Sequence, residues 1–419
     1  MVASGNLTAP CARGPFLTLL AANAVSVVGN QFTALSVPWF VLQTTGSVAK
    51  TGIAGAVTAL SFLASFFGGG LVDRLGFKRA SVIADLASGV TVALVPLLYR
   101  TVGLSFWQVL LLIFARAACD TPGGTARSGM LPDLIALGDI GKERANGLYQ
   151  SSQQGARIAS TMLAGLLIAV VGASNMLWLD ACSFGISATL IVFFVPVARR
   201  TATVPGLRGA YWSGLGEGLR FLRADRILWA ITITAPLVNL ALAALSAVIL
   251  PVYAARVYRT APSLGFLFTG IGAGGLAGAL LYTACGARLP RRGTLLAGVA
   301  MLCPTFGLLA LEPPLAFAAA ILAVGAFFVG PLTVLSAVIA QERVPAALRG
   351  RVFGARGAIM MISTPIGALL GGYLVAGVGL RLALIWATGL LLAVSAQLFA
   401  NRALRGLTAA VGTTLVPAR

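Results

Sequence analysis

The stretch Gly68-Gly69-Gly70-Leu71-Val72-Asp73-Arg74-Leu75-Gly76-Phe77-Lys78-Arg79 joins two apolar runs and carries four charges within seven residues. Its glycines let neighbouring backbones approach closely, and Gly76 permits a turn that a residue with a Cβ would resist. A basic loop beside a membrane needs only a cluster such as Lys78-Arg79. It needs neither an acidic residue nor glycines at these spacings, so the stretch is more specific than a topology signal.

The composition of the chain places it in a membrane. Of its 419 residues, 58% are hydrophobic and only 10% are charged, and the mean hydropathy is +0.94. A soluble protein of this length needs far more polar surface. The chain has no histidine and no P-loop pattern, and its five cysteines are scattered. Triad catalysis, imidazole metal sites and an intrinsic ATPase are thereby excluded, so we expect no enzyme, no metal and no cofactor.

Apolar runs of about 20 residues, each able to cross a hydrocarbon core of about 30 Å, recur along the whole chain. The first six lie near 16–42, 49–71, 79–99, 104–126, 145–171 and 175–197. The second six lie near 227–254, 262–285, 294–311, 314–340, 350–376 and 380–401. The prediction is an all-α polytopic membrane protein with twelve transmembrane helices.

The longest polar stretch, residues 198–226, divides these runs six plus six. Its second part indicates a short amphipathic helix lying along the membrane surface. We therefore expect a six-helix bundle over 1–197, a cytoplasmic inter-domain loop over 198–226, and a second six-helix bundle over 227–419. Short matches between the halves at offsets of 207 and 214 residues indicate that the two bundles are pseudo-symmetric.

Lysine and arginine are distributed unequally between the two sides of these spans. With both termini cytoplasmic, the inner segments hold twenty-two of the thirty basic residues and the outer loops hold five. This is the pattern of the positive-inside rule. The net charge of +19 therefore reflects topology, and we expect no nucleic-acid partner. The predicted location is the cell inner (plasma) membrane.

The opening stretch, from Gly69 to Arg79, resembles the signature between the second and third helices of the major facilitator superfamily. Three further segments resemble its branch of macrolide, tetracycline and enterobactin exporters. They are residues 122–132, which that branch has as an inner loop after the fourth span, 217–223, and 345–352. The resemblance implies transport by rocking of two six-helix halves.

The resemblance also implies an inner gate around the opening stretch. The implied gating residues are Gly69, Asp73, Arg74, Gly76, Lys78, Arg79 and Asp120. We expect Asp120, in span 4, to pair with Arg74 or with Arg116, four residues away on its own helix. Proton carriage is the alternative for Asp120, and Asp85 is the second proton-coupling candidate. Asp180, near the outer end of span 6, is expected to snorkel to the surface.

Polar side chains inside spans are candidates for substrate contact. Span 5 carries a polar stripe that ends at Arg157, about 18 Å from the inner end of its helix and so near the midplane. A tie between Arg157 and a neighbouring span is the alternative. Span 1 has Asn30 where relatives often place an acid, so the expected coupling carboxylate is missing. The substrate-cavity candidates are Asn30, Gln31, Arg116, Gln150, Gln153, Gln154, Arg157, Asn239 and Arg356.

The expected function is that of a secondary active transporter that exports amphipathic drugs or secondary metabolites by alternating access, coupled to protons. One alternative is an exporter of an anionic metabolite such as a siderophore, suggested by Arg116 and Arg157. Another, from a different class, is a non-transporting receptor or lipid-binding scaffold. The expected partners are a small-molecule substrate, protons and the lipid bilayer, and we expect a monomer.

The gate can be tested at Asp73. We expect Asp73→Asn to fold and insert normally but to transport poorly, because Asp73 is expected to meet the inner end of span 11 or a nearby arginine. Removing one member of a half-buried charge pair strands the other. Transport per inserted molecule is the measurement. Full activity of Asp73→Asn at normal membrane abundance would show that the loop has no part in the transport mechanism.

Overall fold

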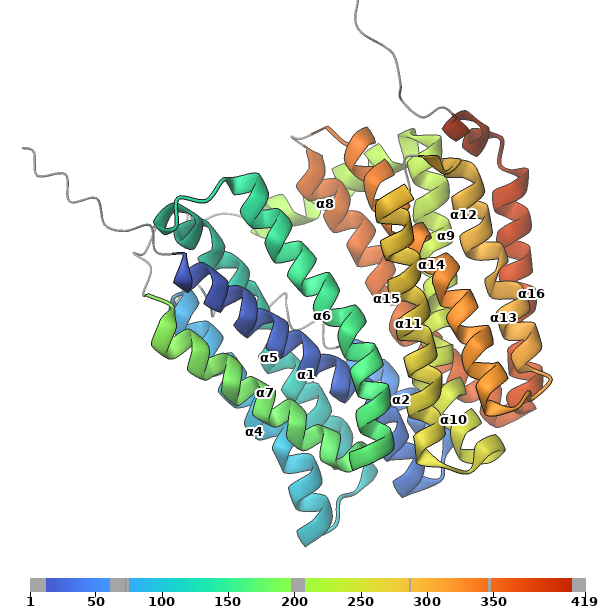
Figure 1. Cartoon of the computed structure of the whole chain (residues 1–419), viewed down its shortest axis with the longest axis horizontal. Helices are drawn as coiled ribbons and strands as arrows, with labels where there is room; N and C mark the ends of the chain where they lie inside the picture. The colour runs from blue at the N-terminus through green and yellow to red at the C-terminus, as the bar shows by residue number, and fades with distance from the viewer. Residues whose placement is uncertain are drawn as a thin grey trace, which may run out of the picture. The chain divides into compact units, whose positions relative to one another are not determined.

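The computed structural model describes residues 13–60, 72, 75–196, 208–285, 288–345 and 348–408, which are helical with short connections and contain no strand (Figure 1). The helices of the first half are α1 (Gly14–Thr45), α2 (Val48–Leu60), α4 (Phe77–Thr101), α5 (Phe106–Leu137), α6 (Lys142–Val171) and α7 (Ala173–Phe194). The stretch between the halves holds α8 (Arg208–Ala224). The helices of the second half are α9 (Arg226–Ala244), α10 (Leu250–Tyr253), α11 (Ala261–Cys285), α12 (Arg291–Ala300), α13 (Leu302–Leu309), α14 (Leu315–Arg343), α15 (Arg349–Val378) and α16 (Leu380–Ala400). The predicted all-helical fold is confirmed.

Nine segments of the described chain are long and apolar enough to cross a membrane. The three other predicted spans are α2, α5 and α6. α2 has only 13 described residues. α5 and α6 have 32 and 30 residues, which is ample length, but they carry charged and amide side chains that lower their hydropathy. With these three helices the predicted count of twelve spans is met, and α8 is the predicted helix of the polar stretch between the halves.

Contacts group the chain into two compact units. The first unit comprises residues 1–33, 61–160 and 174–203. The second unit comprises residues 34–60, 161–173 and 204–419.

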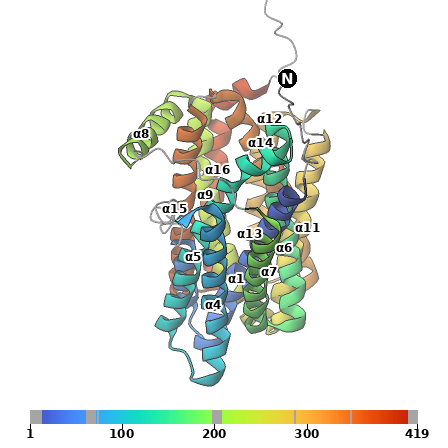
Figure 2. The ribbon, with the colours of Figure 1, turned by 90° about the vertical axis from the view of Figure 1, so that its left-hand side faces the viewer.

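Close helix packing in the first unit depends on two glycines. α4 lies along α5 (Figure 2), and a Cβ on Gly123 of α5 would lie only 3.1 Å from the Cβ of Ala84 on α4. Likewise, a Cβ on Gly29 of α1 would lie 2.9 Å from the Cβ of Ser183 on α7. Small residues of this kind let transmembrane backbones approach, so polar side chains on the four helices come within hydrogen-bonding distance.

The fourth span is longer than the sequence indicated. We expected a span over 104–126 and an inner loop over 122–132, but α5 continues to Leu137 with Pro122 and Pro132 inside it. A membrane helix tolerates proline when neighbouring groups satisfy the freed backbone carbonyls. Continuation of the helix also buries Arg127, which we had counted among the inner-loop residues.

Part of the opening sequence stretch lies within the described residues. Gly76 has φ 80°, a value that favours glycine, as the sequence predicted, and it precedes α4 directly. Lys78 donates from Nζ to the carbonyl oxygens of Val192 and Val195, at 2.9 and 2.6 Å. Lysine there complements the partial negative charge at the end of α7. Arg79 is exposed, and Gly69, Asp73 and Arg74 lie outside the described residues.

In the second unit, helices meet through glycine. Gly270, Gly274 and Gly278 of α11 face the backbone of α14, and Gly367 and Gly371 of α15 face α9. Each would place a Cβ too close to the facing helix for the present packing. The spacing of four residues puts each set of glycines on one helix face, which is typical of close-packing surfaces between membrane helices.

The helix that begins with α9 contains two wider turns. π-helical segments lie at Leu245–Ile249 and Ala254–Tyr258, on either side of α10. Pro251 has no N–H to continue the α-helical bonding, which accounts for the first of them. The Tyr253 and Tyr258 hydroxyls donate to the carbonyl oxygens of Leu309 and Pro313, at 2.9 and 2.6 Å. These bonds anchor the irregular part of the helix to the end of α13.

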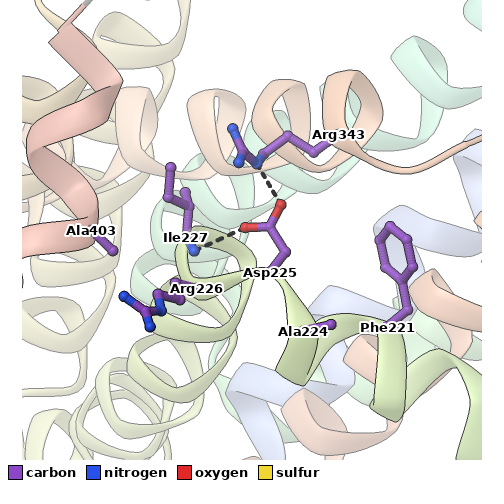
Figure 3. Close-up of a pocket in the computed structure, with 7 residues that line it drawn as sticks. All are labelled: Phe221, Ala224, Asp225, Arg226, Ile227, Arg343 and Ala403. Carbon is purple, nitrogen blue, oxygen red and sulfur yellow. Dashed lines mark hydrogen bonds and ion pairs between the residues drawn. The ribbon is translucent and has the colours of Figure 1, made fainter.

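Asp225 fixes the junction between α8 and α9 (Figure 3). Its carboxylate accepts from the backbone N–H groups of Ile227 and Leu228, at 2.9 and 3.1 Å, and from Nε of Arg343 at 2.7 Å. Burial alone would raise the pKa of Asp225, but the Arg343 hydrogen bond and the two N–H groups together lower it. The ion pair thereby holds the end of α14 at the start of α9, beside an open hollow of about 530 Å³.

The glycine contacts can be tested with two adjacent glycines of α11. Gly274→Ala should destabilise the protein by about 1–3 kcal/mol through overpacking, because its Cβ would meet the backbone of Ala323. Gly275→Ala is the matched control, because the nearest atom to its Cβ is 4.0 Å away. Both changes remove the same backbone flexibility. Thermal unfolding of the purified proteins should separate them, and equal midpoints would refute the backbone contact.

Candidate functional site

A continuous chain of charged and polar side chains runs through the interior of the first unit. It joins α1, α4, α5 and α7. We call it the charge network, and its members are Asn30, Asp85, Arg116, Asp120, Arg127 and Asp180. Because ionisable groups are rare and costly inside membrane spans, the charge network is the candidate functional site.

Arg116 and Asp180 form one end of the charge network. Arg116 Nη2 donates to Asp180 Oδ2 at 2.7 Å, and the side chains are 5% and 0% exposed. The same nitrogen donates to Asn30 Oδ1, and the Thr33 hydroxyl donates to Asp180 Oδ2. The guanidinium lies over the ring of Phe184, 5.2 Å from its centroid. This pair is enclosed and internally neutral.

Arg127 and Asp85 form the other end. Arg127 Nη1 donates to Asp85 Oδ1 at 2.6 Å, and Arg127 Nη2 donates to the Ser26 hydroxyl at 3.1 Å. The Ser187 hydroxyl donates to the second oxygen of Asp85 at 2.7 Å. Asp85 is fully buried with both oxygens bonded. This second pair therefore ties α4 and α5 to each other and to α7 and α1.

Asp120 connects the two ends and is the least completely bonded carboxylate. Asn30 Nδ2 donates to Asp120 Oδ2 at 2.8 Å. The other oxygen, Oδ1, lies 3.6 Å from Arg127 Nη2 and has no hydrogen-bond partner among the described residues. The Asp120 side chain is 19% exposed, whereas those of Asp85 and Asp180 are fully buried.

The charges in the network do not balance. Three carboxylates face two guanidiniums, so the network carries one net negative charge when every group is ionised. An uncompensated charge in a low-dielectric interior is costly, and arginine stays protonated. One proton on one carboxylate makes the network neutral. The arrangement can therefore hold or release a single proton.

Two sequence predictions need correction: Arg116 as the partner of Asp120, and the snorkelling of Asp180. Asp120 was expected to pair with Arg116 or Arg74, but Arg116 pairs with Asp180, and Asp120 lies beside Arg127. Arg74 lies outside the described residues. Asp180 was expected to snorkel outward but is fully buried. Asp180 is buried because Arg116 of the facing helix α5 pairs with it, and this leaves Asp120 beside Arg127, two turns along its own helix.

The remaining predicted residues lie elsewhere. Gln31 and Gln153 are half-buried, and Arg157 is exposed on α6, where its carbonyl accepts from the Ser160 hydroxyl at 2.9 Å. The side chains of Gln150 and Gln154 lie outside the described part of the protein. In the second unit, Asn239 of α9 donates to the Ser363 and Thr364 hydroxyls of α15, at 2.9 and 2.8 Å. Arg356 lies on α15 and lines a cavity with Asn239.

Sequence reasoning missed Arg127, Ser26 and Ser187 as members of the site. Arg127 follows Asp120 by seven residues, which is two helical turns, so the two share a helix face. That spacing is the signal that was available. It was not used because the predicted fourth span ended one residue earlier.

The apolar helices of the described chain, with ionised side chains buried in the first unit, are those of a polytopic membrane protein. The model of the Major Facilitator Superfamily matches residues 19–261 and 232–408, and the chain belongs to this superfamily. It is 34% identical over 380 residues to the multidrug efflux pump Tap of Mycobacterium tuberculosis (strain ATCC 25618 / H37Rv), covering 88% of this chain and 89% of that protein.

Two further comparisons agree. Macrolide efflux protein A of Streptococcus pyogenes is 24% identical over 365 residues, which cover 85% of this chain and 88% of that protein. The crystal structure of the nucleoside transporter NupG is 13% identical with a TM-score of 0.69, covering 92% of this chain and 98% of that one. The structural likeness shows the fold. The efflux proteins match the drug-exporter branch that the sequence motifs indicated.

The charge imbalance predicts that replacing Arg127 and replacing Asp85 affect stability unequally. Arg127→Gln leaves Asp85 and Asp120 without their guanidinium and should cost about 3–5 kcal/mol of stability. Asp85→Asn leaves two carboxylates for two guanidiniums and should cost less. The double variant restores the original excess and should recover part of the loss. Folded yield and thermal midpoint are the measurements, and three equally damaged variants would contradict the charge count.

Proposed function

We propose that the chain exports amphipathic drugs or secondary metabolites from the cell by alternating access, and that protons drive the export. The efflux relatives support the cargo class. We place the protein in the cell inner membrane with both termini cytoplasmic, as the distribution of basic residues favours. We further propose that it acts as a monomer whose two six-helix halves, 1–197 and 227–419, move about the loop 198–226.

The observation that carries the proton coupling is the excess carboxylate of the charge network. Asp85 and Asp180 each have a guanidinium at hydrogen-bond distance, 2.6 and 2.7 Å. Asp120 has only the 3.6 Å approach of Arg127, an unbonded oxygen and partial exposure. A proton from water therefore reaches Asp120 with the least disruption. We assign proton carriage to Asp120 and a structural role to Asp85, the other candidate.

Asn30 explains how coupling persists without an acid in the first span. Its amide donates to Asp120 and accepts from Arg116, so it bridges the two ends of the network. The carboxylate expected on α1 is thus present on α5, one hydrogen bond away. Asn30 fixes the Asp120 carboxylate when it is ionised. When Asp120 is protonated, its attraction to Arg127 is lost.

Protonation of Asp120 would alter packing at the point where α1, α4 and α5 meet. Ionised Asp120 draws Arg127 and Asn30 together, which holds α5 against α1. Neutral Asp120 leaves Asp85 as the one charged partner of Arg127 among the described residues and weakens this tie. The contact between α5 and α1 thus has a tighter and a looser arrangement, and a proton on Asp120 selects between them. Coupling requires such a two-state element. We propose that the loop residues Gly69, Asp73, Arg74, Gly76, Lys78 and Arg79 form the gate that responds.

An exporter of anionic metabolites is the second candidate, and one observation favours it. Arg116 no longer supports it, because Asp180 neutralises that guanidinium within the first unit. Arg356 in the second unit does support it, since no described carboxylate pairs with its guanidinium. Transport into inverted vesicles of one cationic and one anionic dye would separate the two candidates.

Asp120→Asn should abolish export driven by a pH gradient while substrate binding changes no more than a few-fold. The variant keeps the shape of the side chain and can accept from Asn30, but it cannot carry a proton. Dye export by proteoliposomes with an imposed pH gradient is the measurement, together with proton release on substrate binding. Asp133→Asn on the same helix is the control. Retained pH-gradient dependence in Asp120→Asn would overturn the assignment.

The swap variant Asn30→Asp/Asp120→Asn makes the test sharper. It exchanges carboxylate and amide between α1 and α5 and preserves the net charge of the network. Partial recovery of pH-gradient dependence is expected, because a titratable group again lies between Arg116 and Arg127. No recovery in a well-folded swap variant would mean that position 120 itself, and not the network, is required.

A further inference from the structure

The second unit encloses a cavity that the charge network does not explain. Its volume is about 310 Å³, and it lies between α9, α12, α14, α15 and α16. Its walls are mostly apolar, with Ile231, Val299, Leu332 and Met360 among them. This is the size and character of a small-ligand site, which is commonly apolar with few polar groups.

Arg356 supplies a charged group to this apolar cavity. It lies on α15 within a membrane-crossing segment and is half-buried. Its Nη1 donates to the carbonyl oxygen of Ser336 at 3.1 Å, the only hydrogen bond that its guanidinium makes within the described chain. Arginine has five N–H donors and stays protonated in proteins. Most of its donors therefore remain for water or a ligand.

The carboxylates of the second unit are engaged elsewhere. Only four acidic residues occur in it. Glu217 pairs with Arg351, Asp225 with Arg343 and Glu342 with Arg291, at 2.5, 2.7 and 2.6 Å. The fourth, Glu312, lies in the connection between α13 and α14, beyond the cavity-lining residues. No carboxylate of the described second unit therefore balances Arg356.

Arg356 lies inside α15 and not at its start, so its charge is not simply a helix-end charge in solvent. Arg356 is seven residues from the start of α15, about 10 Å along its axis. Its bond to the carbonyl of Ser336 holds the guanidinium at the cavity wall. Asn239 lies on the same wall but has both amide hydrogens bonded to α15 hydroxyls. Arg356 is thus the group that can recognise an anion here.

We propose that this cavity binds an amphiphile with one anionic group, whose charge pairs with Arg356 and whose apolar body contacts the α9 and α12 walls. A guanidinium suits a carboxylate or sulfonate because it can donate two parallel hydrogen bonds. The ligand would supply the charge that the second unit lacks. The proposal concerns binding and does not depend on proton-driven export.

The test uses the full chain in nanodiscs of phosphatidylcholine, with decanesulfonate and decyltrimethylammonium as probes of equal chain length and opposite charge. The thermal midpoint is followed as each probe is titrated. Decanesulfonate should raise the midpoint of the unaltered protein more than decyltrimethylammonium does. Arg356→Gln should weaken the apparent affinity for decanesulfonate at least about tenfold.

Three variants serve as controls. Arg356→Lys keeps the charge but loses the paired hydrogen bonds, so its affinity should be intermediate. Arg381→Gln removes one exposed charge from α16 away from the cavity and should bind normally. Ala235→Phe fills the cavity from α9 and should weaken binding even if Arg356→Gln folds poorly.

Two arms distinguish the source of the natural ligand. Mass spectrometry of the purified protein would reveal a fatty carboxylate that is depleted in Arg356→Gln, which identifies the bilayer as the source. Export of an anionic fluorescent amphiphile that is lost in Arg356→Gln would identify transported cargo. Equal response to the two probes, or equal decanesulfonate affinity with and without Arg356, would overturn the proposal. Cationic-dye export reports separately on the proposed function.

Discussion

The first unit depends on the neutralisation of charge inside an apolar bundle. Two guanidiniums and three carboxylates lie where each ion would be strongly penalised alone, so the helices must bring opposite charges together. Gly29 and Gly123 make this possible by removing side chains from two contact points. The charge network then sets the helix positions: α1, α4, α5 and α7 cannot separate far without stranding an ion.

The second unit is held together by different means. Glycines of α11 and α15 bring backbones into direct contact, and the ion pairs that join helices, such as Asp225–Arg343, lie at or beyond the ends of the membrane-crossing segments. Backbone contact responds weakly to pH, whereas the charge network gains or loses attraction with one proton. A proton on one carboxylate would therefore weaken attraction within the first unit, whereas the glycine contacts of the second unit contain no group that it could titrate.

Sequence analysis predicted the elements better than their partners. Span length follows from apolar run length, so the prediction of the membrane spans succeeded. The end of α5 was misplaced because Pro122 and the glycines after it are turn residues in water, whereas in a bundle the helix continues. The partner of Asp180 could not be found, because helical spacing reports neighbours on one helix only. Arg127 was missed beside Asp120 because the predicted fourth span ended before it.

The wider turns after α9 have a consequence for comparing this chain with its relatives. Each π-helical segment accommodates one residue more than an α-helical turn, which rotates every later side chain around the helix axis. A relative with a regular helix here would align only with gaps near Leu245–Ile249 and Ala254–Tyr258. An ungapped alignment would place lipid-facing residues opposite buried ones such as Tyr253. Evolutionary comparison of this span must therefore follow its hydrogen bonds and not its residue count.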